Sequence, residues 1–180
     1  MSIPFRDLRE EAPSGLIGFL RFIEEEGGRG LRAALFLVNS RGEPLDFSFA
    51  RVDVHASFLW RQGEAHRLAV ASLARTLFIA AANVPQLLVT LAVEVPPAVF
   101  TEDMGVAIPL CRVAEASALA YGAAESIEEL PDAQHIFWVG VPPEPDSVAR
   151  CLLDALVARQ GLLEPFERAA RGLQEAYAMT

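Results

Sequence analysis

The sequence predicts a single α/β (α+β) domain with a mostly antiparallel sheet of about five strands flanked by helices. A chain of 180 residues has the length of one compact domain. Its short apolar runs, typical of strands, alternate with longer segments in which apolar residues recur at helical intervals. No repeat and no low-complexity linker divides residues 1–180, so we expect no domain boundary.

The chain is expected to begin with an irregular arm over residues 1–13, where Pro4 and Pro13 flank a charged stretch. Ser14 precedes apolar residues at helical spacing and is therefore a candidate N-cap. The paired glycines Gly27 and Gly28 would end such a helix. We therefore predict a first helix over residues 14–26.

Two segments are expected to pair as a hairpin. Residues 33–38 form a continuous apolar run, typical of a buried strand, and turn-forming residues follow it. Leu45, Phe47 and Phe49 then alternate with polar residues, which is the period of a half-buried strand. Because only a turn separates the two segments, we expect them to be antiparallel neighbours.

A second helix is predicted over residues 63–82, with Pro85 beyond its end. Its second half is almost entirely apolar, so it should lie against the sheet or against a partner. Residues 86–95 and 106–110 are each expected to form a strand.

The last third of the chain has weaker signals at its start and clear helices at its end. Residues 112–134 show weak helical patterning among small side chains, and residues 135–141 read as a strand. Asp146 or Ser147 can cap the helix that follows. A C-terminal helix with one apolar face is predicted over residues 163–178.

This order of elements resembles two fold families. Roadblock and longin domains place a five-stranded antiparallel sheet between helices, and the order matches theirs although no motif does. The alternative resemblance is to the ribonuclease H-like arrangement, which also begins with a hairpin. Nucleases of that type hold metal ions with carboxylates, one of them central in the first strand. The run 33–38, taken as that strand, contains no carboxylate, so this resemblance implies a non-catalytic copy.

Composition excludes several chemistries. All 15 basic residues are arginine, so there is no lysine nucleophile, Schiff base or phosphate-loop lysine. The net charge of −9 repels phosphate backbones and anionic lipids, so direct binding of nucleic acid is not expected, although a local arginine patch can override the average. Cys111 and Cys151 lack the spacing of a zinc or redox pair. Apolar runs too short to span a bilayer indicate no membrane association and a cytoplasmic location.

Few residues are candidates for a site. Asp53 and His55 form a weak alternative metal pair, because both can point the same way from the end of an extended strand. His66 follows on the predicted second helix, without an HExxH pattern. No nucleophile elbow is present either, so we assign no catalytic, cofactor-binding or metal residue and expect no cofactor.

One window combines aromatic, aliphatic and guanidinium groups, a composition typical of interface hot spots. These candidate interface residues are Phe58, Leu59, Trp60 and Arg61. Their aromatic rings can equally fill the end of the core.

These observations predict a non-catalytic protein-interaction or regulatory subunit that pairs with itself or with a larger protein. The reasons are the 52 % hydrophobic content and the missing catalytic patterns. Two alternatives remain open. One is a metal-dependent hydrolase or nuclease of the ribonuclease H-like fold, and the other is a module that binds a small ligand among its aromatic residues.

Overall fold

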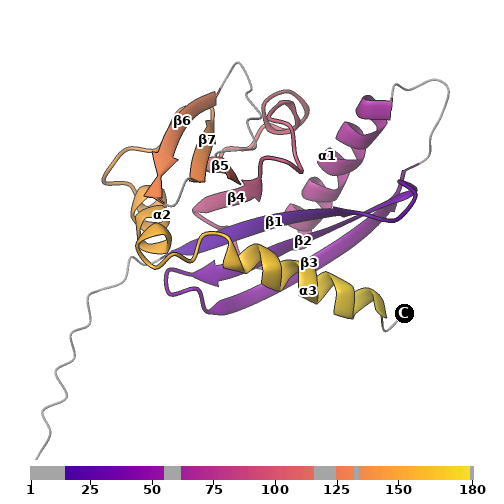
Figure 1. The fold of residues 1–180 in the computed structure, drawn as a ribbon, viewed down its shortest axis with the longest axis horizontal. Helices are drawn as coiled ribbons and strands as arrows, with labels where there is room; N and C mark the ends of the chain where they lie inside the picture. Colours follow the sequence, from indigo (N-terminus) through magenta and orange to yellow (C-terminus); the bar gives the residue numbers. More distant parts are fainter. Residues whose placement is uncertain (1–14, 55–61, 116–124, 132–133, 179–180) are drawn as a thin grey trace, which may run out of the picture.

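A computed structural model of the protein describes residues 15–54, 62–115, 125–131 and 134–178. Within these residues, seven strands form one mixed sheet in the order β3-β2-β1-β4-β5-β7-β6. Helix α1 covers one face of the sheet, and helices α2 and α3 cover the other (Figure 1). The protein is therefore a single α/β domain with three layers.

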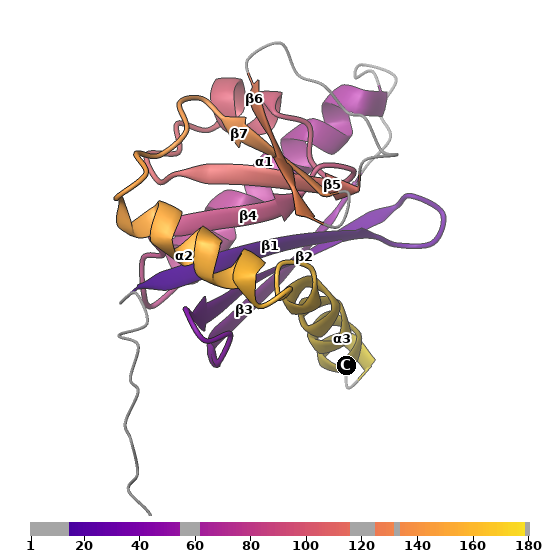
Figure 2. The ribbon, with the colours of Figure 1, turned by 60° about the vertical axis from the view of Figure 1, so that its left-hand side comes forward.

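The described elements in chain order are β1 (Leu16–Glu24), β2 (Gly30–Asn39), β3 (Pro44–Asp53), α1 (Gln62–Ala80), β4 (Leu87–Leu91), the π-helix η1 (Val99–Asp103), β5 (Leu110–Glu115), β6 (Glu125–Leu130), β7 (Gln134–Val139), α2 (Val148–Ala158) and α3 (Glu164–Ala178). The first three strands form an antiparallel meander. After α1 the chain returns to the other side of β1, where β4 runs parallel to β1 and β5 runs parallel to β4. Strands β7 and β6 complete the sheet in antiparallel register (Figure 2).

The first helix predicted from the sequence is in fact strand β1. Its apolar residues satisfy helical spacing only because they are nearly continuous, and a strand buried on both faces gives the same pattern. Phe19 faces α2 and α3, whereas Leu20 and Phe22 face α1. Strand β1 pairs with β2 along its whole length and with β4 on its other side. Burial on both faces and pairing on both edges therefore override the local helical signal.

The sheet is also larger and less antiparallel than predicted. It has seven described strands instead of about five, and two neighbouring pairs are parallel. The two additional strands are β1, which was predicted as a helix, and β6, which lies within residues 112–134, where weak helical patterning was predicted. The strand predicted over residues 106–110 is displaced, because β5 begins at Leu110 and continues to Glu115. Strand β6 forms a hairpin with β7, and β5 lies between β4 and β7, so pairing at the strand edges overrides the weak helical signal. The roadblock and longin order is thus incorrect.

Other local predictions are confirmed. Strands β2 and β3 form the expected hairpin, with a register shift after Leu37. Ser147 caps α2, because its hydroxyl accepts a hydrogen bond from the Arg150 backbone N–H at 3.3 Å. The second half of α1, in contrast, is not fully covered: Ile79 is 86 % exposed.

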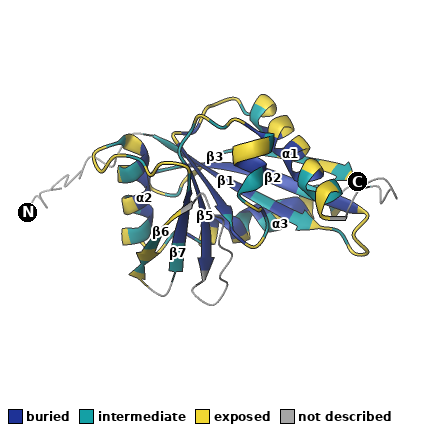
Figure 3. Ribbon diagram, turned by 90° about the horizontal axis from the view of Figure 1, so that it is seen from above, coloured by how far each residue is buried: buried dark blue, intermediate teal, exposed yellow. Residues whose placement is uncertain are grey.

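The core has two main parts, one on each face of the sheet. Leu73 and Leu77 of α1 pack on one face of β1 and β2. On the other face, Phe19 meets Phe166 of α3 edge to face, with ring centroids 5.1 Å apart. The central strands are buried, and the outward sides of the helices are exposed (Figure 3). No helix among the described residues is long and apolar enough to cross a membrane.

Candidate functional site

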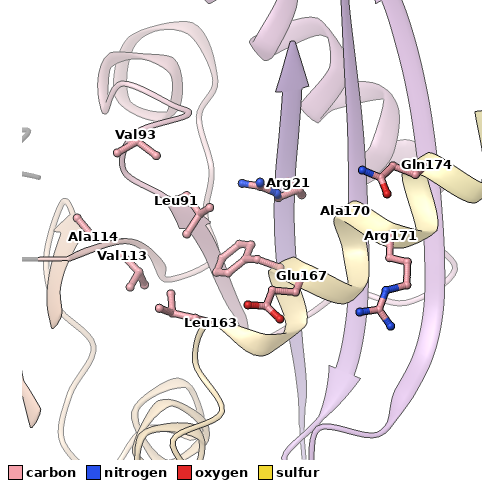
Figure 4. A pocket seen from close by; sticks show the side chains of 11 residues that line it. Arg21, Leu91, Val93, Val113, Ala114, Leu163, Glu167, Ala170, Arg171 and Gln174 are labelled. Atoms are coloured by element: carbon pink, nitrogen blue, oxygen red, sulfur yellow. The ribbon is translucent and has the colours of Figure 1, made fainter. Parts of the chain in front are cut away.

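A pocket of about 530 Å³ lies between α3 and the carboxyl ends of β1, β4 and β5 (Figure 4). We call it the α3 cleft. From β1 the chain proceeds outward to β2 and β3 and then returns to the other side of β1, where it continues outward with β4 and β5. The strand order therefore reverses between β1 and β4. Such switch points, outside the carboxyl ends of strands, are where open α/β sheets bind ligands. The cleft is lined by Arg21, Leu91, Val93, Val113, Ala114, Leu163, Phe166, Glu167, Ala170, Arg171 and Gln174.

An ion pair occupies the junction of β1 and β4 beside the cleft. Arg21 of β1 pairs with Glu94, which follows β4, and the two side chains are 23 % and 11 % exposed. Glu94 also accepts a hydrogen bond from the Phe22 backbone N–H at 2.9 Å. Burial lowers the pKa of the Arg21 guanidinium. The pair therefore joins two strands at the point where the fold opens toward α3.

Helix α3 contributes the opposite wall. Glu167, Arg171 and Gln174 lie at intervals of four and three residues, which places them on one side of the helix (Figure 4). Arg171 is exposed and makes no salt bridge with another residue of the described segments. The remaining wall is apolar and includes Leu91 and Val113. The cleft can therefore hold an anionic group with guanidinium donors while apolar parts of the ligand contact its wall.

A second arginine stiffens the strands under the cleft. Arg112 of β5 is almost fully buried, and its guanidinium donates a hydrogen bond to the Ala92 carbonyl at 2.8 Å. The same group lies 6.0 Å from the centroid of the Phe137 ring. This hydrogen bond ties the end of β4 to β5, so Arg112 supports the cleft without lining it.

The residues predicted from the sequence do not meet in this cleft. Asp53 pairs with Arg51 at 2.7 Å at the end of β3, and His55 lies outside the described residues. His66 of α1 lies 3.0 Å from the carboxylate of Glu24. The four candidate interface residues, Phe58, Leu59, Trp60 and Arg61, also lie outside the described residues, so that interface stays a prediction.

The residues that do line the cleft were missed because they come from distant parts of the chain. One signal was available: Arg21 is the only charged residue inside the apolar run 16–23. A lone charge in a buried strand requires a partner, which indicates a polar site. Its partner, Glu94, is brought near only by the parallel pairing of β1 with β4.

Comparison with known proteins identifies the fold. No family model matches the sequence, and no curated protein is significantly similar to it. The structure resembles endonuclease V from Bacillus subtilis, with a TM-score of 0.58 and 10 % identity over 92 % of this chain and 81 % of that chain. It also resembles endonuclease V from Streptomyces avermitilis, with a TM-score of 0.57 and 16 % identity over 92 % of this chain and 84 % of that chain. The observed fold therefore fits the ribonuclease H-like alternative and not the roadblock and longin order.

These comparisons correct the functional prediction. Both solved structures reported above are endonuclease V, which contradicts the prediction of a non-catalytic protein-interaction or regulatory subunit. The expectation that nucleic acid is not bound is overturned in the same way. It rested on the net charge of −9, and an average over the whole chain does not describe where individual arginines gather. The expectation of no cofactor depended on the same rejected function and is also withdrawn.

A catalytic metal centre, which a nuclease of this fold would imply, does not fit the described residues. Among them, no three His, Cys, Asp or Glu side chains gather into a metal-binding group. The true first strand, β1, has Arg21 where a carboxylate would be needed and has its only acid, Glu24, at its end. Glu94 is already held by Arg21 and by the Phe22 N–H group. We therefore derive no metal-dependent step.

Proposed function

We propose that this chain binds nucleic acid and holds a phosphodiester strand in the α3 cleft. The observation that carries the proposal is Arg171, which is exposed and has no salt-bridge partner within the described segments, in a cleft at the switch point of the sheet that the Arg21–Glu94 pair shapes. The likeness in fold to two endonuclease V structures supports the same class of ligand.

The two arginines have different parts in this proposal. Arg171 is exposed and makes no salt bridge within the described segments, so its N–H groups are available to phosphate oxygens. Arg21 is neutralised by Glu94 and mainly shapes the cleft. The apolar wall includes Val93, which is 69 % exposed and can contact a sugar or a base. Contacts of this kind are made mainly to the phosphate backbone of the nucleic acid, so we expect binding with little preference for base sequence.

Fluorescence anisotropy with labelled single-stranded and duplex oligonucleotides tests this function. Arg171→Glu should weaken binding by about 10-fold or more at low salt, because an attractive phosphate contact becomes repulsive. Arg29→Glu is the matched control, since Arg29 is an exposed arginine in the turn between β1 and β2 and also makes no salt bridge within the described segments. Equal losses in the two variants, or no binding by the wild type, would refute the proposal.

Cleavage of the bound strand is a second candidate. It is favoured by the likeness in fold to endonuclease V and by an exposed carboxylate in the lining of the cleft, Glu167. Labelled strands incubated with Mg²⁺, Mn²⁺ or a chelator, and resolved on a denaturing gel, give the test. Cutting by the wild type that is lost in Glu167→Gln supports this candidate. Intact strands under every condition, together with measurable binding, exclude cleavage and leave the binding function.

A further inference from the structure

A second pocket, of about 460 Å³, lies beside the first two turns of α3, on a different side of the helix from the α3 cleft. Three elements form it: the turn between β2 and β3, the end of α2 and the start of α3. Each of them contributes one arginine, namely Arg41, Arg159 and Arg168. We call this site the arginine pocket.

Two of its arginines are fixed to the same turn. Arg159 Nη1 donates to the Ser40 carbonyl at 3.2 Å, and Arg168 Nη2 donates to the Gly42 carbonyl at 3.0 Å. The Arg168 guanidinium is also oriented by Glu164, at 2.7 Å. Ser40 and Gly42 are the neighbours of Arg41, so these bonds hold both guanidinium groups beside the turn that carries the third arginine.

Most of the donors in the arginine pocket remain available. A guanidinium has five N–H donors. Arg159 uses Nη1, and Arg168 uses Nε and Nη2. The Arg41 side chain is exposed and has no hydrogen-bond or ion-pair partner within the described segments. Among the described residues of the lining, Glu164 provides the only carboxylate, so three positive charges face one negative charge. A local excess of positive charge in a chain with a net charge of −9 requires an explanation.

We propose that the arginine pocket binds a phosphate group of the nucleic-acid strand that occupies the α3 cleft, an inference that rests on the proposed function. Arg168 in the pocket and Arg171 in the cleft are three residues apart on α3 and are therefore neighbours on its surface. Neighbouring side chains of this kind have Cβ atoms about 5–6 Å apart. At about 3.4 Å per nucleotide along one strand, about two nucleotides would join the two sites.

The test compares Arg41→Gln with Arg29→Gln. Both are exposed arginines in hairpin turns, and both lack salt-bridge partners within the described segments, so the two variants change the net charge equally. We expect Arg41→Gln to weaken oligonucleotide binding by about 3- to 10-fold and to reduce the slope of log K against log salt concentration by about 0.7 for a single strand. We expect Arg29→Gln to bind as the wild type does. Equal effects of the two substitutions, or no effect of either, overturn the proposal.

A second measurement separates this inference from the proposed function. If the wild type binds no oligonucleotide, the proposed function fails, and the pocket is then tested with inorganic phosphate alone. Thermal unfolding is followed in sodium phosphate and in sodium chloride of equal ionic strength. If the melting temperature is higher in phosphate, and Arg41→Gln abolishes this rise, the arginine pocket binds a phosphate group that does not belong to a nucleic-acid strand. Absence of both strand binding and a phosphate-dependent rise overturns the pocket as well.

Discussion

Replacing Glu94 with glutamine should lower stability and strengthen binding at the same time. Removing one partner of a fully buried ion pair costs about 3–5 kcal/mol, whereas an exposed pair contributes at most about 1 kcal/mol. The Arg21–Glu94 pair lies between these limits, with side chains 23 % and 11 % exposed. The glutamine oxygen can still accept the Phe22 N–H bond. We therefore expect a loss of about 2 kcal/mol in the free energy of unfolding.

Urea denaturation at pH 7 measures this loss. With an m-value of about 2 kcal/mol per molar urea, the midpoint should fall by about 1 M while m stays constant. Glu102→Gln is the control, because Glu102 pairs with Arg67 at 3.2 Å but is 65 % exposed, so its removal should cost less than about 1 kcal/mol. In the same Glu94→Gln protein, the released Arg21 charge should increase oligonucleotide affinity. A midpoint like that of the wild type, or an equal shift in the control, would refute the reasoning.

Three further predictions follow from particular contacts. Gly172→Ala should lower the free energy of unfolding by about 1–3 kcal/mol, measured by thermal unfolding, because the new Cβ would lie 2.8 Å from the ring of Phe47. Gly63→Ala is the control and should not destabilise the protein, because a Cβ at that position meets nothing within 4 Å. Hydrogen bonds from Arg51 and Arg32 lower the pKa of Glu25 from 4.5 to about 2, so the stability that this carboxylate contributes is complete above pH 4.5 and is lost as the pH falls toward 2. In Glu25→Gln, the melting temperature should therefore depend less on pH between 4.5 and 2 than it does in the wild type. The same pH dependence in both proteins would contradict the assignment. Cys111 is buried, which raises the pKa of its thiol, whereas Cys151 is exposed. Mass spectrometry after iodoacetamide treatment should therefore show one adduct on the native protein and two on the unfolded protein. Rapid labelling of both cysteines in the native protein would contradict the burial of Cys111.

The sequence determined the elements whose signals are local. The hairpin of β2 and β3 follows from an apolar run, a turn and an alternating strand, and all three features lie within residues 33–49. The start of α2 follows from Ser147, whose side chain bonds to a backbone N–H group three residues away. The absence of lysine and the net charge of −9 are properties of the sequence alone.

Tertiary structure decided that residues 16–24 form a strand, and it also decided where the α3 cleft and the arginine pocket lie. A continuous apolar run is compatible with a buried helix or a buried strand, and only the pairing of β1 with β2 and β4 selects the strand. The α3 cleft depends on the contact of Arg21 with Glu94 across a parallel pair of strands. The arginine pocket depends on Arg159 reaching the carbonyl of Ser40, 119 residues earlier in the chain. Long-range pairing of this kind cannot be read locally, because Glu94 and Arg159 look like ordinary surface charges, and the lone charge of Arg21 in an apolar run indicates a polar site without identifying its partner.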